Sequence, residues 1–121
     1  MRKTIVIGID ITSINRIEKM YEKFGEKAYE KFLNPKEIEF VKKADTAAGF
    51  WAAKEAASKA LGTGIGASCG FHDIKISKGK LGNPKIKYKK KVRKAFGIKD
   101  SFLSITHDSG FAIAVVVNVL K

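Results

Sequence analysis

The most constraining feature of the sequence is an alanine-rich stretch near its middle, residues 47–60, in which most side chains are small or apolar. Alanine is the strongest helix former, and a helix that is apolar on almost every side is buried on most of them. Asp45 or Thr46 is placed to begin this helix, and Gly62 is placed to end it. The fold must therefore provide other elements that cover most of this helix.

The segments on either side of the alanine-rich stretch predict strands and shorter helices. A strand over residues 4–9 ends at Asp10, and a helix capped by Ser13 follows it as far as Gly25. Asn34-Pro35 is typical of the start of another short helix. One strand, then helices, then mostly strands with one basic helix among them indicates an α+β fold. After Gly62 the alternating pattern predicts strands at residues 71–77, 85–88, 102–106 and 111–119.

Length and apolar content indicate one globular domain, residues 1–121, because a chain of this size buries roughly two thirds of its unfolded surface. The single cysteine, Cys69, excludes an internal disulfide and agrees with a reducing cytoplasm. Asp10 cuts the first apolar run too soon for a signal peptide, and the last one, residues 111–117, is too short to span a bilayer. We expect a cytoplasmic protein without membrane contact.

The charge balance predicts a negatively charged partner. Lysine plus arginine number 24 against 12 acidic residues, which gives a net charge of +12. Nucleic acid, anionic lipid, phosphorylated cofactors and acidic proteins all fit this sign. Because nearly all the basic residues are lysines, and arginine reads guanine edges better, diffuse attraction is favoured over base readout. The lysine-rich segment 85–94 keeps nucleic-acid binding as the rival hypothesis, next to a plain solvated face.

Two carboxylates stand in apolar surroundings, Asp10 after the first strand and Glu55 inside the alanine-rich helix. Carboxylates are seldom buried without a partner, so each needs an explanation. Asp10 can be a cap or turn residue, and Glu55 can pair with Lys59 at the i, i+4 spacing. Together they are typical of an Mg²⁺ site that water and substrate phosphate complete. Lys54 and Lys59 can then neutralise the phosphate oxygens.

Three further signals are weaker. The glycine loop, residues 62–66, follows a helix, whereas a dinucleotide loop follows a strand. It is either a helix stop or a place where the backbone approaches a ligand closely. His107 ends a predicted strand, where it can donate to phosphate or complete a turn. His72 has no cluster of acidic residues or histidines around it and is interpreted as structural.

Three motifs stand in order along the chain. They are Val6-Ile7-Gly8-Ile9-Asp10 with Arg16, Trp51-Ala52-Ala53-Lys54-Glu55-Ala56-Ala57-Ser58-Lys59-Ala60 with the glycine loop, and Leu103-Ser104-Ile105-Thr106-His107. In this order the sequence resembles bacterial holo-acyl-carrier-protein synthase, a 4'-phosphopantetheinyl transferase. The central motif is the most specific of the three.

This resemblance implies a compact α+β phosphopantetheinyl transferase fold that assembles as a homotrimer, with active sites between subunits. It also implies the reaction: 4'-phosphopantetheine moves from coenzyme A to a serine of an acidic acyl carrier protein, and 3',5'-ADP is released, in the service of fatty acid biosynthesis. The serine hydroxyl of the carrier is the nucleophile. The group that removes its proton stays open between a metal-held water and a carboxylate.

The resemblance assigns each candidate residue a role by position. Asp10 and Glu55 correspond to the Mg²⁺ ligands, and Lys59 contacts phosphate. His107 lies beside the ribose phosphate of coenzyme A. The cleft for coenzyme A is lined by the glycine loop, through Gly62, Gly64 and Gly66.

The carrier protein has its own expected contact. Arg16, on the exposed face of the first predicted helix, corresponds to a residue that meets the acidic helix of the carrier. An acidic partner accounts for a lysine-rich surface through electrostatic steering. Two positions depart from the family pattern, since Phe50 stands where many members have arginine and Asn83 where they have a basic residue.

Overall fold

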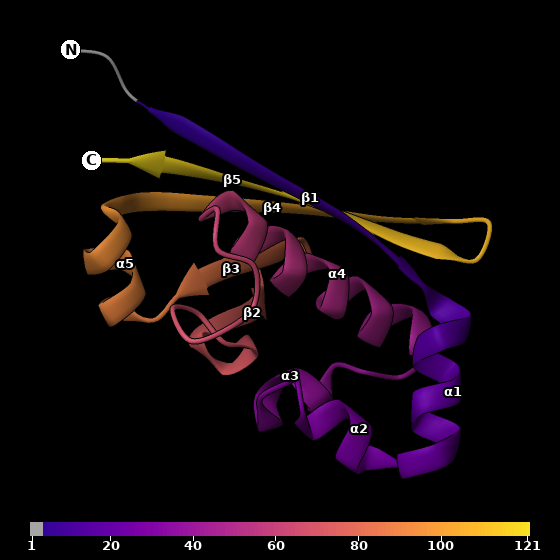
Figure 1. Ribbon diagram of the computed structural model, residues 1–121. Coiled ribbons are helices and arrows are strands. Elements are labelled where there is room, and N and C mark those ends of the chain that lie inside the picture. The colour runs from indigo at the N-terminus through magenta and orange to yellow at the C-terminus, as the bar shows by residue number, and fades with distance from the viewer. Residues whose placement is uncertain (1–3) are drawn as a thin grey trace.

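The central element of the fold is helix α4, Ala44–Ala60, which the other elements surround (Figure 1). The structure is a computed structural model and describes residues 4–121. Helix α4 packs on one face of a three-stranded antiparallel sheet of order β1-β5-β4. As predicted, most of its side chains are buried. The strands are β1, Ile5–Ser13, β4, Ile98–Asp108, and β5, Phe111–Leu120.

Three short helices connect β1 to α4, and the predicted signals mark both ends of the first and the start of the third. Ser13 caps α1, Ile14–Phe24, because its Oγ accepts a hydrogen bond from the backbone N–H of Arg16 at 3.3 Å. Gly25, with φ of 63°, ends this helix. Helix α2, Glu26–Glu30, follows directly, and α3, Pro35–Glu39, has Asn34 as its N-cap.

A small hairpin and a basic helix follow α4. Strands β2, Ile74–Lys78, and β3, Pro84–Tyr88, pair in an antiparallel sheet of their own. Helix α5, Lys90–Phe96, ends at the left-handed Gly97. None of the helices within residues 4–121 is long and apolar enough to cross a membrane.

The predicted strand 71–77 is wrong in its first three residues. Residues Phe71–Asp73 form a 3-10 helix, η1, because the Asp73 carboxylate accepts a hydrogen bond from the N–H of Gly70 at 2.9 Å and closes a turn. Strand β2 begins only at Ile74. An alternating sequence pattern does not distinguish this local turn from the start of a strand.

Two strands are longer than predicted. Strand β1 continues past residue 9 to Ser13, and β4 covers residues 98–108 where 102–106 was predicted. Both extensions pair with β5, as the register of Ser13 with Phe111 and of Ile98 with Leu120 shows. These segments contain polar residues, so their hydrophobicity pattern does not predict strands. The backbone hydrogen bonds to β5 nevertheless continue through them. The predicted α+β class is confirmed.

Gly8 brings α4 unusually close to β1. A Cβ atom at Gly8 would lie 1.9 Å from the carbonyl oxygen of Ala56 and 2.6 Å from the backbone nitrogen of Ala60. No larger residue fits between the two backbones, and the two residues of the helix at this crossing, Ala56 and Ala60, are alanines. The contact brings the last turn of α4, which carries Lys59, next to Ile9 and Asp10 of β1.

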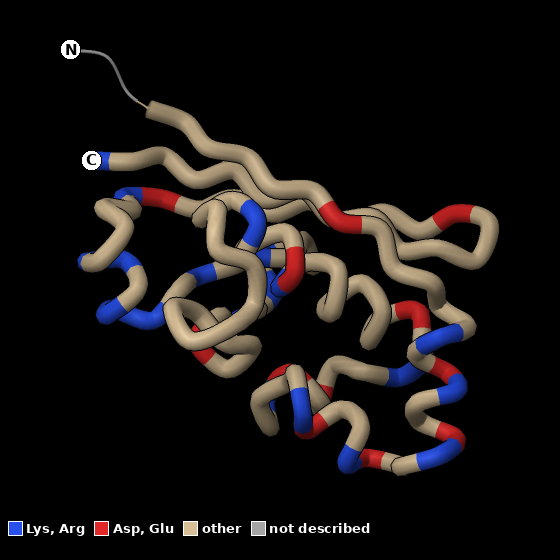
Figure 2. The backbone as a smooth tube through the Cα atoms, in the orientation of Figure 1, with Lys and Arg blue, Asp and Glu red and all other residues tan. Residues whose placement is uncertain are grey.

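The other face of the three-stranded sheet is apolar and exposed. The helices lie on the side of α4 (Figure 1), and the three long strands carry few charged residues (Figure 2). Ile7 is 64% exposed. We call this surface the outer sheet face, and its exposed large side chains are Ile5, Ile7, Ile9, Ile11, Phe102 and Phe111.

Candidate functional site

Asp10 is the centre of the candidate site. It lies on the same side of β1 as Gly8, the side that meets α4, because alternate residues of a strand point to one face. Its Oδ1 accepts a hydrogen bond from Lys59 Nζ at 2.9 Å, and its Oδ2 accepts one from Thr12 Oγ1 at 2.9 Å. Asp10 pairs with Ala114 within the sheet, so it is a strand residue and not a cap or turn residue.

After its first turn, α4 has one stripe that is not buried, and Glu55 belongs to it. The stripe consists of Trp51, Glu55 and Lys59 at four-residue spacing. Partial burial raises the pKa of Glu55, and the negative charge of Asp10 raises it further, while Lys59 and Arg16 oppose the shift. The ammonium of Lys59 binds Asp10. Among the described residues no ion pair within 4.0 Å joins Glu55 to Lys59, so the simple helical pair is not formed.

The chemistry of Asp10 and Glu55 fits a divalent cation. Two carboxylates that repel each other gain stability when a cation lies between them, and repulsion by Asp10 is, after burial, the second cause of the raised pKa of Glu55. No group of three or more potential metal ligands occurs within residues 4–121. A pair of carboxylates suits Mg²⁺, which keeps several waters and takes the rest of its shell from substrate phosphate. Lys59 adds a positive charge, and its side chain is half exposed.

Arg16 lies beside this cluster. Its guanidinium is stacked over the ring of Trp51, 5.0 Å from the ring centroid. Trp51 stands one helical turn before Glu55, and the charge of Arg16 lowers the pKa of that carboxyl. The structure thus brings Arg16, Glu55, Asp10 and Lys59 onto one surface. Nothing local in the sequence predicts the Arg16–Trp51 contact, since the two residues belong to different helices.

The glycine loop begins directly after this stripe. Gly62 and Gly64 have φ values of 84° and 69°, a conformation that favours glycine, and the N–H of Gly62 bonds to the carbonyl of Lys59 at 2.9 Å. The helix-stop interpretation is therefore confirmed for these two residues. Gly66 has neither a positive φ nor any atom within 4 Å of an added Cβ. Its backbone is open to close approach by a ligand.

His107 lies apart from the carboxylates within one chain. Its Nε2 lies 2.9 Å from the carbonyl oxygen of Asp45, in the first turn of α4. Asp45 and Glu55 are ten residues apart, which is about 15 Å along the helix axis. A single chain therefore does not bring His107 to the cluster around Asp10.

The predicted phosphate contact of Lys54 is wrong for this structure. Its side chain is fully buried, and its Nζ forms an ion pair with the Glu37 carboxylate at 2.7 Å. An ammonium with no exposed surface cannot reach a phosphate. Phe50, one of the two departures from the pattern that the resemblance implies, is also buried in the core. Asn83 lies in the hairpin turn, where its carbonyl accepts a hydrogen bond from Gly79.

Two polar contacts, those of Thr12 and Glu37, were not predicted from the sequence. Thr12 is two residues after Asp10, so the strand period already places it on the same face. Glu37 stands three residues after Asn34, which is the spacing of a capping box, but its ion pair with Lys54 is not local.

Comparison with known proteins places the chain among enzymes. The model of the 4'-phosphopantetheinyl transferase superfamily matches residues 6–116. The holo-[acyl-carrier-protein] synthase of Aliarcobacter butzleri is 78% identical over 116 residues, which cover 96% of this chain and 98% of that protein. The one from Campylobacter jejuni subsp. jejuni is 54% identical over 113 residues, or 93% and 98% of the two chains.

Solved structures agree with this result. The crystal structure of Helicobacter pylori holo-[acyl-carrier-protein] synthase in complex with coenzyme A matches with a TM-score of 0.90 and 51% identity, covering 93% of this chain and 98% of that one. The Bacillus anthracis enzyme, in complex with CoA (3',5'-ADP), matches with a TM-score of 0.80 and 38% identity, covering 96% of each chain. The chain therefore belongs to the 4'-phosphopantetheinyl transferase superfamily.

Proposed function

We propose that the protein is a holo-[acyl-carrier-protein] synthase, which transfers 4'-phosphopantetheine from coenzyme A to a serine of an apo acyl carrier protein and serves fatty acid biosynthesis. Residues 1–121 then form one phosphopantetheinyl transferase domain. The observation that carries this proposal is the cluster of Asp10, Glu55 and Lys59 where β1 meets α4. The relatives with this printed name, and the related structure with coenzyme A bound, support the same reaction.

The reaction needs no nucleophile from this chain. The serine hydroxyl of the carrier forms a bond to the β-phosphorus of coenzyme A, the pyrophosphate P–O bond breaks, and 3',5'-ADP leaves. The residues of the protein have to align the two substrates and neutralise the phosphate charge. The proposed phosphate contact is Lys59, and its ion pair with Asp10 at 2.9 Å supports this role because it holds the ammonium beside the cluster. Held by Asp10 and Glu55, Mg²⁺ would supply Lewis-acid stabilisation of the phosphate oxygens.

Coenzyme A would reach the cluster along the glycine loop. Gly62, Gly64 and Gly66 directly follow the stripe that carries Lys59, and the open backbone at Gly66 supports close approach of the cofactor. His107 is proposed to bind the ribose phosphate. Its distance from the cluster within one chain fits a site that two chains build together. The rival hypothesis, nucleic-acid binding, rests on the basic segment 85–94 and on a net charge that an acidic carrier explains equally well.

The outer sheet face supports a homotrimer. Exposed apolar patches of this kind mark interfaces between proteins, and here the patch runs along β1, the strand that carries Asp10. Assembly through this face would bring elements of a neighbouring chain close to the candidate site.

A cytoplasmic location, in which Cys69 stays reduced, fits the use of coenzyme A and an acyl carrier protein. Burial of Cys69 within the fold raises the pKa of its thiol to about 11, which keeps the group protonated and unreactive.

The transfer itself is tested by intact-mass analysis of an apo acyl carrier protein incubated with this protein, coenzyme A and Mg²⁺. We expect a phosphopantetheine mass gain that disappears with a chelator. Asp10→Ala and Glu55→Ala should each lower the rate by roughly 100-fold or more, because each removes a ligand of the metal. The exposed Asp100→Ala, near the start of β4 and at the other end of the sheet from Asp10, is the control and should keep the wild-type rate. A wild-type rate for either ligand variant would remove the metal assignment.

Glu55 should make the metal-free protein less stable as its carboxyl ionises. Its pKa is raised in the folded state, so the folded protein binds the proton more tightly than the unfolded chain, and stability falls as pH rises through the folded pKa. Glu55→Gln removes this loss. In chelator, the difference between the Tm of Glu55→Gln and that of the wild type should increase as the pH rises from about 5 to about 8.

In Mg²⁺ the order of the two Tm values should reverse, so that the wild type becomes more stable than Glu55→Gln. The ion stabilises the folded wild type by mass action, and the Tm of Glu55→Gln should respond much less. The exposed Glu22→Gln serves as the control for removing a charge. A Glu55→Gln protein that is less stable than wild type at neutral pH in chelator would contradict the electrostatic description of the site.

Arg16 is proposed to meet the acidic helix of the carrier. Arg16→Glu should raise the KM for the carrier at least about fivefold with little change in the KM for coenzyme A, because the reversed charge lies on the surface proposed to meet the acidic helix of the carrier. Lys94→Glu on α5 makes the same change of charge on a different element and is the control. An unchanged carrier KM for Arg16→Glu would count against this docking surface.

The trimer is tested by sedimentation equilibrium, in which we expect about three times the chain mass of 13.3 kDa. Ile7→Lys should dissociate it, since a charge in the middle of the outer sheet face cannot be buried without a partner. Leu81→Lys, at a hairpin position that is 95% exposed, is the matched control and should leave the mass unchanged. A monomeric wild type would refute the proposed assembly.

A further inference from the structure

Two buried charges have no part in the proposed reaction. Glu37 on α3 and Lys54 on α4 are 1% and 0% exposed, and they form an ion pair of 2.7 Å. Among the described residues they are the only charged side chains in the buried class. Burying two charges removes their hydration, and a well-packed apolar pair of similar volume is often at least as stable. A gain in stability is therefore not by itself sufficient reason for this pair.

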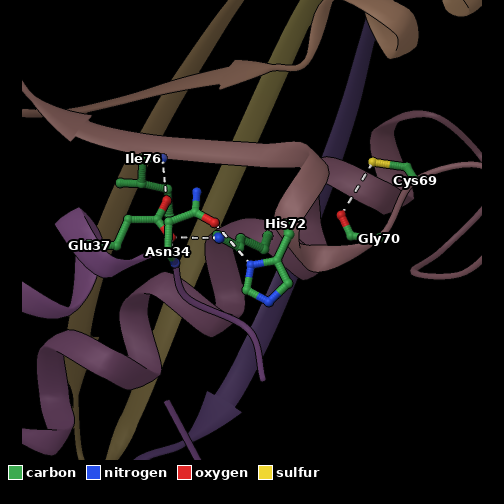
Figure 3. Close-up of polar contacts among 7 residues, drawn as sticks. Asn34, Glu37, Cys69, Gly70, His72 and Ile76 are labelled. Carbon is green, nitrogen blue, oxygen red and sulfur yellow. Dashed lines mark hydrogen bonds and ion pairs between the residues drawn. The ribbon is translucent and has the colours of Figure 1, made fainter. Parts of the chain in front are cut away.

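The Glu37 carboxylate joins three elements. Its Oε1 accepts hydrogen bonds from Lys54 Nζ and from the backbone N–H of Asn34, each at 2.7 Å. Its Oε2 accepts one from the backbone N–H of Ile76 on β2, also at 2.7 Å. Figure 3 shows the carboxylate between Asn34 and Ile76. Charge-assisted bonds of this length are directional, so α3, α4 and β2 meet in one defined geometry.

Lys54 is the residue directly before Glu55. Successive residues of a helix are about 100° apart around its axis, so fixing Lys54 toward α3 sets the direction in which Glu55 points. The crossing at Gly8 fixes how closely α4 approaches β1, but alanine methyl groups cover much of the helix, and such small side chains define its rotation about its own axis less sharply than a directional polar contact does. A second anchor lies at Ala57, whose carbonyl accepts a hydrogen bond from Tyr88 Oη at 2.7 Å. Glu55 lies between these two anchors.

We propose that the Glu37–Lys54 ion pair is a positioning device, which sets the rotation of α4 so that the Glu55 carboxylate faces Asp10. Glu37 and Lys54 are positioning residues and not catalytic ones, since neither has surface to offer a substrate. The inference rests on the proposed function, in which Asp10 and Glu55 hold the metal. Residues that orient metal ligands in other proteins typically change metal affinity or activity by 10–100-fold when they are replaced.

The test uses the full-length protein and Mn²⁺, a spectroscopically visible substitute for Mg²⁺. The double variant Glu37→Gln/Lys54→Met removes both charges and nearly keeps the side-chain volumes. We expect its Kd for Mn²⁺, measured by electron paramagnetic resonance, to rise roughly 10-fold or more, and kcat to fall by a similar factor. The KM for coenzyme A should change much less. Val92→Ala, a core truncation on α5, provides a control with lowered stability and should keep the wild-type Kd.

A second variant covers the case in which the double variant does not fold. Glu37→Asp keeps the charge but shortens the side chain by one methylene group, so it should pull α4 out of position and weaken Mn²⁺ binding severalfold. A wild-type Kd and kcat for either folded variant would overturn the inference. So would failure of both variants to fold, because the pair would then be needed for folding itself.

The wild type is measured first, which separates the two hypotheses. If it neither binds Mn²⁺ nor modifies the carrier, the proposed function fails and the positioning role fails with it. If the wild type does both and the variants do so equally well, only the positioning role is refuted.

Discussion

The direct contact of two backbones at Gly8 is the constraint on which the candidate site depends. Because a Cβ there would lie 1.9 Å from the Ala56 carbonyl oxygen, any other residue would push α4 away from β1. That approach puts Asp10 within hydrogen-bond distance of Lys59, although 49 positions separate them in the sequence. The alanines of α4 serve the same purpose, since their small side chains let the helix settle against the sheet. The site is therefore a product of close packing and of the charges that it brings together.

A helix surrounded by apolar contacts needs polar anchors to define its orientation. Tyr88 supplies one, because its hydroxyl donates to the Ala57 carbonyl and accepts a hydrogen bond from Asn118 Nδ2 at 2.8 Å. Burial raises the pKa of Tyr88 to about 12, so this donor keeps its proton at any physiological pH. Asn118 in turn accepts a hydrogen bond from Ser101 at 2.8 Å. Strands β3, β4 and β5 thus hold the helix through one buried network, and no buried side-chain polar atom of residues 4–121 lacks a partner.

Local patterns in the sequence predict most of the fold. The apolar character of residues 47–60, the cap at Ser13 and the stops at Gly25 and Gly97 correspond to features that a few neighbouring residues determine. The same holds for the choice of Asp10 and Glu55 as carboxylates in unusual surroundings. What could not be predicted is non-local. Lys54 looks like a phosphate ligand by its place next to Glu55, and only the fold reveals that it pairs with a glutamate 17 positions earlier. The full length of β1 and β4 likewise depends on pairing with β5.

The stacking of Arg16 on Trp51 has a practical consequence for spectroscopy. Trp51 is the only tryptophan in the chain, and a cationic side chain lies 5.0 Å from the centroid of its ring. The emission of an indole depends strongly on nearby charge and on exposure to water. When tryptophan is excited selectively, the fluorescence of this protein therefore originates from one ring, a single helical turn from Glu55. An unlabelled sample carries its own optical reporter at the place where the two substrates would meet.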